Sequence, residues 1–225
     1  MTASRGRAGG TGGAGRTGRT GRPPLTEERK AEIRLEIAHA AVDLFVAQGV
    51  AATTGEQIGQ AVGVSARTVW RYFPSKEACV APLFTAGIDA IAACLRAWRP
   101  GTPLEEVFER ALAGASRPVR GPEGRAPVGA LVRLTRTEPA LRAVWLQSYD
   151  EAEPAFARAL ADRAGLPPGD LRPALQAAML NAALRAAVEH HAWHLEGGAA
   201  DADASERELA RVMREALRVA AGGLA

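Results

Sequence analysis

The chain has 225 residues, of which 28 are basic and 25 acidic, and it carries a formal net charge of +3 at pH 7. Hydrophobic residues make up 47% of it, enough for a folded core, and no run of 18 consecutive apolar residues is present to span a membrane. Its two cysteines, Cys79 and Cys94, are too far apart along one expected helix, at roughly 20 Å, to form a disulfide. We therefore expect a soluble cytoplasmic protein with no membrane partner.

Positive charge is concentrated at the front of the chain. Residues 1–30 hold seven basic and two acidic residues, whereas residues 77–225 hold 17 basic and 19 acidic ones. Residues 1–24 consist largely of Gly, Arg and Thr and cannot bury a core, which predicts a disordered basic arm. Two interpretations stay open: the arm follows DNA, with residues 19–24 similar to a minor-groove hook, or it is a tolerated tail.

A first helix is predicted ahead of Gly49. Apolar residues recur at helical spacing, and Gly49 then supplies the permissive backbone at which a helix ends. The apolar positions are Ile33, Ile37, Ala40, Ala41, Leu44 and Phe45. They give the helix one face suited to a core.

Two short helices joined by a glycine turn are predicted next. Thr54 is placed to cap the first of them, and Gly63 permits the turn that ends it. Val64 in the turn packs between the helices, and Ser65 caps the second helix, over residues 66–72. This pattern is typical of a helix-turn-helix that binds DNA.

The second helix of this motif has an outer face suited to the major groove. Arg67 can make a bidentate contact to guanine, and Thr68 can offer a hydroxyl or a methyl group to a base. Trp70, Arg71 and Tyr72 add an indole, a guanidinium and a phenol. The alternative is that these charged side chains form an ordinary solvated face.

Lys76 is a lysine in a chain whose cations are nearly all arginine. Lys30 and Lys76 are the only lysines among 28 basic residues. Lys76 follows Ser75, which can cap the next helix, and main-chain amides at a helix start favour anions. We expect Lys76 to bind a DNA phosphate, and a solvated position is again the alternative.

A longer pattern surrounds the helix-turn-helix. It comprises Ala40-Ala41 ahead of Leu44-Phe45, then Gly49, Thr53-Thr54, Gly63-Val64-Ser65, Thr68, an aromatic at 70, Tyr72-Phe73 and Ser75-Lys76-Glu77. In this pattern residues 33–79 resemble the TetR family of bacterial transcriptional regulators. The resemblance implies an all-α protein with an N-terminal three-helix helix-turn-helix DNA-binding domain and a C-terminal helical ligand-binding and dimerisation domain.

The resemblance also implies which side chains meet operator DNA. The DNA-binding residues are expected to be Thr54, Ser65, Ala66, Arg67, Thr68, Trp70, Arg71, Tyr72 and Lys76. Within this set, base edges would be faced by Ala66, Arg67 and Thr68, phosphates would be contacted by Thr54, Trp70 and Lys76, and Tyr72 would hold the DNA backbone. The partner is double-stranded DNA.

Three positions depart from the family pattern. Gly55 stands where the family has an apolar residue, and Gly59 replaces an alanine, so this helix is expected to be weaker by roughly 0.5 to 1 kcal/mol per glycine. Trp70 replaces a tyrosine and exchanges a phenol for a bulkier indole N–H. We expect Trp70 to keep a phosphate contact with a changed reach.

The rest of the chain shows helical signals and few strand signals. Helices are predicted over residues 76–98, 102–115, 128–137, 139–164, 169–195 and 204–221, with a Pro- and Gly-rich loop over 116–127. Thr102 and Glu105 form a capping box, and Pro154 is expected to kink its helix. The expected domains are a basic arm over residues 1–24, a DNA-binding domain over 25–76 and a helical domain over 77–225.

The last two predicted helices carry apolar residues on more than one face. In helix 169–195, Leu171 and Leu175 lie on one side and Met179 on the next, and helix 204–221 shows a similar array. Such surplus faces fit a homodimer interface formed by these two helices, which the resemblance also implies. The alternative is that both faces pack within one monomer.

Candidate ligand-binding residues are five large apolar side chains of the second domain and one polar pair. They are Trp98, Phe108, Trp145, Tyr149, Met179, Asn181 and Arg185. The apolar ones fit a ligand cavity and an ordinary core equally well. Asn181 and Arg185 lie four residues apart on a mostly apolar helix and need partners, either across a dimer or from a bound molecule.

Metal and catalytic signals are weak. His190 and His194 could reach one metal ion together, but they make half a site, and histidines near a helix C-terminus are explained by its dipole. No GxxxxGK loop, GxSxG elbow or HExxH motif is present. We assign no metal, no cofactor and no enzymatic activity.

The expected function is that of a TetR-type regulator on the nucleoid of a bacterial cytoplasm. As a repressor, a homodimer would bind a palindromic operator, and an unidentified small molecule would release it. Two alternatives stay open: a non-switching architectural or recruiter protein, and a metal-responsive regulator that uses His190 and His194.

Overall fold

The structure is entirely helical in the part of the chain that it describes. This computed structural model describes residues 26–99, 101–104, 106–108, 110, 128–167, 169–194 and 202–222, and all regular elements among them are helices. The predicted all-α class is confirmed. Three expectations lie outside the described residues: the basic arm over 1–24, the loop over 116–127 and the Glu105 half of the capping box.

Three helices form the N-terminal domain. Helix α1 spans Glu27–Gln48, α2 spans Gly55–Ala61 and α3 spans Ala66–Tyr72. Thr26 caps α1, and Gly49, at a φ of 87°, ends it as predicted. The inward sides of the three helices share one core, which includes Ile37, Val42, Phe45, Ile58 and Val69.

A 3-10 turn interrupts the single helix expected over residues 76–98. Glu77–Val80 forms the 3-10 helix η1, and α4 then spans Ala81–Arg96. Pro82 lies in the first turn of α4. One continuous α-helix would need the N–H of residue 82 to bond the carbonyl of Ala78, and proline has none. The α-helix therefore begins anew beside Pro82.

The stretch Glu77–Arg96 is long and apolar enough to cross a membrane by composition, with a mean hydropathy of 1.8. A search for 18 consecutive apolar residues misses it because Thr85, Gly87 and Asp89 interrupt the run. In the structure α4 packs along α7, and its inner side chains belong to the central core. Core helices of folded proteins pass the same compositional test.

The second half of the chain supplies α6 to α9. Helix α6 spans Val128–Leu134, α7 spans Pro139–Ala164, α8 spans Leu171–His194 and α9 spans Ala202–Gly222. Leu104, residues 106–108 and Arg110 are helical too, within the predicted range 102–115. Pro154 lies inside α7, and the kink expected there stays a prediction.

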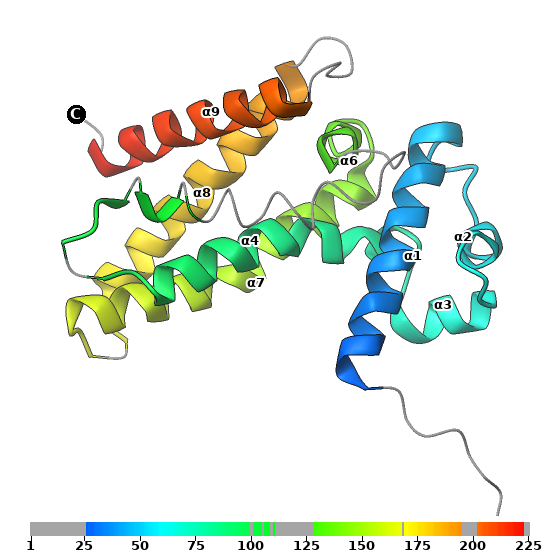
Figure 1. Cartoon of the computed structure of the whole chain (residues 1–225), viewed down its shortest axis with the longest axis horizontal. Helices are drawn as coiled ribbons and strands as arrows, with labels where there is room; N and C mark the ends of the chain where they lie inside the picture. Colours follow the sequence, from blue (N-terminus) through cyan, green and yellow to red (C-terminus); the bar gives the residue numbers. More distant parts are fainter. Residues whose placement is uncertain are drawn as a thin grey trace, which may run out of the picture.

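Figure 1 shows α1, α2 and α3 at one end of the molecule and the long helices of the second domain extending away from them. Helix α4 leads from the first group and runs beside α7, while α9 lies over α8. Helix α1 contacts α4 and α6 as well. Buried side chains of both domains therefore form one continuous core.

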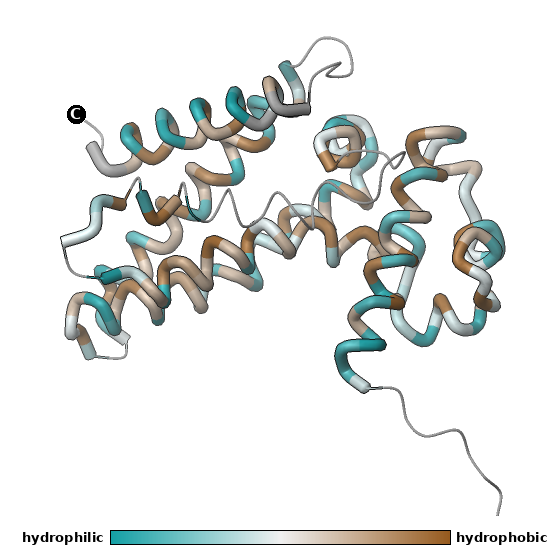
Figure 2. The backbone as a smooth tube through the Cα atoms, in the orientation of Figure 1, coloured by the Kyte–Doolittle hydropathy of each residue, from teal (hydrophilic) through white to brown (hydrophobic). Residues whose placement is uncertain are grey.

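Helix α9 is amphipathic, and hydrophilic and hydrophobic turns alternate along it in Figure 2. Its apolar side, with Met213 and Leu217 buried, packs against α8. The exposed side carries ion pairs three residues apart, from Arg211 to Glu208 and from Arg218 to Glu215. The main apolar face of α9 is therefore used within the monomer, which was one of the two alternatives for this helix.

Candidate functional site

The helix-turn-helix is held by caps at the start of both of its helices. Thr54 accepts a hydrogen bond from the Gln57 N–H at 3.3 Å, and the Gln57 side chain accepts one from the Thr54 N–H at 2.8 Å. Ser65 accepts one from the Thr68 N–H at 3.2 Å and caps α3. These bonds fix the residues at which α2 and α3 begin.

Gly59 is required by the close approach of α2 to the turn that follows it. The Val64 N–H donates to the Gly59 carbonyl at 2.8 Å. A β-carbon at position 59 would lie 2.6 Å from the Val64 carbonyl oxygen, a clash with backbone that cannot easily move. This glycine therefore permits the tight turn, and the weakening of the helix expected from it stays a prediction.

Gly55 lies against the indole of Trp70. A β-carbon at Gly55 would lie 1.9 Å from Trp70 Cζ2, so no side chain fits at position 55 while the indole holds this place. Gly55 is buried, whereas Trp70 is 43% exposed. Gly55 and Trp70, which both depart from the family pattern, are thus neighbours in space and complementary in size.

The outer face of α3 presents cationic groups without carboxylate partners. Arg67 and Arg71 are exposed, and neither forms an ion pair within the described part of the chain. The Arg71 guanidinium lies over the Tyr72 ring, 5.1 Å from its centroid. The half-buried positions of the helix are Ala66, Thr68 and Tyr72. Arg67 is therefore the α3 cation with the most freedom to reach a base.

Lys76 is bound by the protein itself. Its ammonium donates hydrogen bonds to the carbonyl oxygens of Val50 at 2.6 Å, Thr53 at 2.9 Å and Ala51 at 3.4 Å. An ammonium has three donors, and all three are used here. Lys76 thus joins the start of η1 to the segment between α1 and α2, and the expected phosphate contact stays a prediction.

Four of the candidate ligand-binding residues meet between α7 and α8. Trp145 and Tyr149 come from α7, and Asn181 and Arg185 come from α8. The Trp145 ring lies edge-on to Tyr149, with centroids 4.7 Å apart, and edge-on to Phe84 of α4, with centroids 4.8 Å apart. The group is therefore bordered by three helices.

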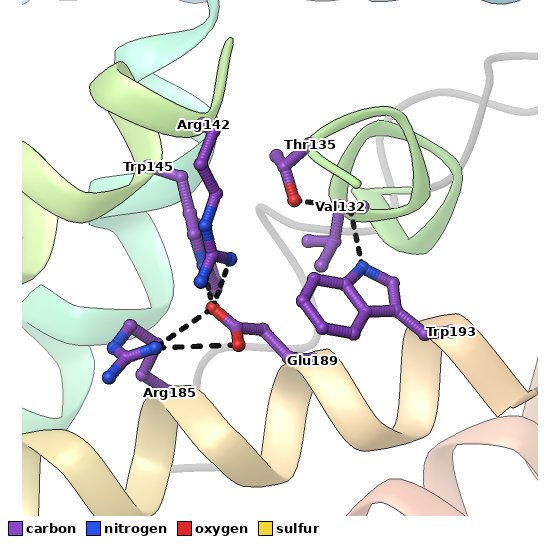
Figure 3. A network of polar contacts seen from close by, with 7 residues as sticks. All are labelled: Val132, Thr135, Arg142, Trp145, Arg185, Glu189 and Trp193. Carbon is purple, nitrogen blue, oxygen red and sulfur yellow. Dashed lines mark hydrogen bonds and ion pairs between the residues drawn. The ribbon is translucent and has the colours of Figure 1, made fainter. Parts of the chain in front are cut away.

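Glu189 is the centre of this group, although the sequence did not single it out as a ligand-binding candidate. Figure 3 shows its carboxylate accepting hydrogen bonds from Arg142, from Trp145 Nε1 at 2.7 Å and from Arg185 at 3.2 Å. Burial alone would raise the pKa of Glu189, but the bonds from Arg142 and Trp145 outweigh it and hold that pKa below its usual value. Glu189 stays ionised and joins α7 to α8.

The polar pair on α8 finds its partners inside the same chain. Asn181 donates to the Tyr149 main-chain oxygen and to Glu153, and Arg185 pairs with Glu189. The expectation that both residues need a second subunit or a ligand is therefore wrong for these bonds. A glutamate four residues after Arg185 is the sequence signal that could have indicated the internal pairing.

Met179 lies on the outside of the protein and not with the other candidates. Two positions along an α-helix correspond to a rotation of about 200°, so Met179 faces away from Asn181. It is 47% exposed and forms a stripe with Leu171 at 68% and Leu175 at 53%. Phe108 is fully buried in the core.

Trp98 lies apart from the Glu189 group, beyond the end of α4. Its Nε1 donates to the Thr102 carbonyl at 2.9 Å, and the Arg163 guanidinium lies 3.7 Å from its ring centroid. It borders a surface hollow of about 340 Å³, whose other lining residues are Leu95, Arg96, Ala159, Asp162 and Arg163. The structure therefore does not bring Trp98 to the same site.

The histidine pair lies at the end of α8. The rings of His190 and His194 are stacked with centroids 4.3 Å apart, and His194 Nδ1 lies 2.8 Å from the His190 carbonyl oxygen. Among the residues that the structure describes, no group of three His, Cys, Asp or Glu side chains could hold a metal ion. The metal-responsive alternative gains no third ligand from them.

Comparison with known proteins identifies the family. Residues 37–83 match the profile of bacterial regulatory proteins of the tetR family, and residues 102–225 match the profile of the MftR C-terminal domain. The chain is also 34% identical over 179 residues to the HTH-type transcriptional regulator TcmR of Streptomyces glaucescens, covering 77% of this chain and 78% of that protein. The chain belongs to the TetR family. The resemblance found in the sequence is confirmed.

Solved structures support the fold of this TetR-family regulator. A TetR-family protein from Mesorhizobium loti matches with a TM-score of 0.51 at 22% identity, over 86% of this chain and 98% of the other. The fatty acid degradation regulator FadR from Bacillus halodurans matches with a TM-score of 0.53 at 18% identity, over 89% and 98%. Both share the fold of an N-terminal helix-turn-helix with a C-terminal helical domain.

Proposed function

We propose that this TetR-family regulator is a homodimeric repressor that binds a palindromic operator and is released by a small molecule. The outer face of α3 carries the proposal, because Arg67 and Arg71 are exposed there without ion pairs in the described residues, on a helix with a fixed start. Such a helix suits the major groove. The base-facing residues would be Ala66, Arg67 and Thr68, and the positioning residues would be Thr54, Ser65, Trp70, Arg71 and Tyr72.

The dimer would form through α8 and α9. Leu171, Leu175 and Met179 follow one another at intervals of four residues and make an exposed apolar stripe on α8. Val219 of α9 is exposed as well. Contiguous apolar surface of this kind marks interaction sites on soluble proteins. A two-fold dimer would present two copies of α3 to half-sites about 34 Å apart.

The effector would bind in the helical domain, beside Trp145, Tyr149, Asn181 and Arg185. These residues lie where α4, α7 and α8 meet, and α4 leads through η1 to the DNA-binding domain. A molecule that separates or draws together these helices would change the distance between the two α3 helices of a dimer. Repression would follow from steric blocking of a promoter, in the cytoplasm and without catalysis.

Selection of bound sequences from random double-stranded DNA tests the proposal. The full chain should enrich a palindrome with two half-sites, and Arg67→Ala should lose that preference. Arg158→Ala, a change of an exposed arginine on α7, serves as the matched control and should enrich the same palindrome. Repeating the selection with cell extract reveals any releasing ligand. Enrichment of no sequence by the wild-type chain would contradict the function.

A further inference from the structure

The Asn181 side chain is buried but only partly satisfied. Its Nδ2 donates hydrogen bonds to the Tyr149 main-chain oxygen at 2.9 Å and to Glu153 Oε2 at 3.2 Å. Its Oδ1 is buried without a hydrogen-bond donor, and the residue is only 6% exposed. Because buried acceptors in folded proteins nearly always have a donor, this oxygen is a place where a bound molecule can supply one.

The orientation of the Asn181 amide follows from its neighbours. Both atoms near Nδ2 are oxygens that can only accept, namely a main-chain carbonyl and a carboxylate. Exchanging the oxygen and nitrogen of the amide would place Oδ1 against two other acceptors, which is unfavourable. The unsatisfied atom of this residue is therefore an acceptor, and it calls for a donor.

Tyr149 provides a second unused polar group in the same region. Burial, and after it the charge of Glu189, raise the pKa of the Tyr149 hydroxyl, while Arg185 opposes them, so the hydroxyl keeps its proton. No hydrogen bond involves that hydroxyl within the described part of the chain. It can therefore donate to an acceptor on a bound molecule.

Three aromatic rings of the core pack together in the same region. The Tyr149 ring is edge-on to Trp145, which is in turn edge-on to Phe84, with centroids 4.7 and 4.8 Å apart. Stacked and edge-on contacts with such a row of rings favour a ligand that is itself flat and apolar. The rings thus favour an aromatic ring system in the ligand, and the polar atoms favour hydrogen-bonding substituents on it.

The charges of this region are already balanced. Arg142 and Arg185 pair with Glu189, and Glu153 bonds Asn181. Two guanidinium groups and two carboxylates lie here, so a carboxylate, phosphate or ammonium group on a ligand would meet like as well as opposite charge and would unbalance the region. Burying an extra charge without a partner is costly. The chemistry of the site therefore favours an uncharged ligand.

We infer that the effector is an uncharged aromatic molecule with a hydroxyl or amide N–H group that donates a hydrogen bond to Asn181 Oδ1. Phe84, Trp145 and Tyr149 hold its rings, and the Tyr149 hydroxyl donates to a second polar group on it. The inference rests on the effector-regulated function proposed above and specifies the chemical class of that effector.

Three matched probes test the inference by calorimetry on the full chain. They share one ring system: 2-naphthol has a hydroxyl donor, 2-methoxynaphthalene has only an acceptor, and 2-naphthoate has a charge. Naphthol should bind wild type about tenfold more tightly than either of the others, because only it satisfies Asn181 Oδ1. Equal binding of naphthol and its ether, tightest binding of naphthoate, or no binding of all three would overturn the inference.

Variants locate the preference. Asn181→Leu removes the acceptor at similar volume and should bring the ratio of the naphthol and ether affinities to about one. Gln147→Leu, at an exposed α7 residue whose side chain bonds Glu151, is the matched control and should keep the wild-type ratio. A wild-type ratio that persists in Asn181→Leu would overturn the assignment. The comparison of the three probes uses the wild-type chain, so it remains valid even if a variant fails to fold.

The inference and the underlying function can fail separately. Operator binding by the wild-type chain, measured by mobility shift with selected DNA, does not depend on any probe. If the chain binds an operator and an anionic compound releases it, the regulatory function stands and the effector class is wrong. If the chain binds no operator, the proposed function itself fails.

Discussion

Trp70 of α3 occupies the space that a side chain on Gly55 of α2 would need. The virtual β-carbon of Gly55 lies 1.9 Å from Cζ2 of the indole and 2.6 Å from two further ring atoms. Each residue departs from the family pattern, and each makes the other possible. The first turn of α2 and the outer face of α3 are therefore complementary in size at this contact.

Gly55→Ala is expected to displace the indole of Trp70. The methyl group would meet the outer end of a side chain that can swing away, and the higher helix propensity of alanine offsets the lost packing, so the free energy of unfolding should change by about 1 kcal/mol or less. Operator affinity should fall, because Trp70 would leave the position from which we propose that it contacts the DNA. Fluorine NMR of the chain labelled with 5-fluorotryptophan resolves the ring that moves. An unchanged Trp70 signal would contradict the pairing, and Gly55→Ala/Trp70→Tyr, with a smaller ring, should recover affinity.

Arg67→Ala is expected to relax base preference by roughly 1 to 3 kcal/mol, the value of a bidentate contact to a base. The effect should appear as a smaller difference between the selected operator and versions with one changed base pair. Competition binding measures that difference. If Arg67→Ala weakened all these sequences alike, Arg67 would be a phosphate contact and not a base contact.

Lys76→Met is expected to lower the free energy of unfolding by about 1 to 3 kcal/mol, since the part-buried bonds to the carbonyls of Val50 and Thr53 are lost. Urea denaturation measures it. Lys30→Met is the control: Lys30 pairs with the exposed Glu27, and loss of such a surface ion pair should change stability little. The salt dependence of operator binding tests the expected phosphate contact separately. If Lys76 also contacts a phosphate, the slope of log affinity against log salt should be lower by about one in Lys76→Met.

Leu175→Glu combined with Met179→Glu is expected to dissociate the proposed dimer, because two charges would enter its proposed apolar interface. Sedimentation velocity at micromolar concentration should show a monomer with unchanged helical content. Leu146→Glu is the matched control, since Leu146 of α7 is similarly exposed but lies off the α8 stripe. Dimers that survive the double change would place the interface elsewhere.

Local chemistry made much of the fold predictable. The predicted range of α3, residues 66–72, agrees with the structure because Ser65 caps its first turn, and the predicted range of α7 agrees because Pro139 opens it and Gly165 ends it. These signals depend on neighbours within a few residues. The break before α4 was missed although its cause, Pro82, is equally local.

Contacts between distant segments could not be predicted in the same way. The acceptors of Lys76 lie 23 to 26 residues before it, and Arg142 lies 47 residues before Glu189. In both cases, the sequence around one partner does not indicate which distant residue it will contact. Four members of the group between α7 and α8 were therefore named from the sequence as ligand-binding candidates, a role that stays a prediction, while the carboxylate at the centre of the group appeared only in the folded chain.

The two opposite faces of helix α8 have different surroundings. Asn181, Arg185 and Glu189 face α7, whereas Leu175 and Met179 face outward. A rigid helix rotates as one body. A ligand that rotates the inner face of α8 would therefore also move the outer face, and with it a partner molecule bound there. Two subunits joined along α8 would then sense occupancy of each other's interior, and the first effector molecule to bind would alter the affinity for the second.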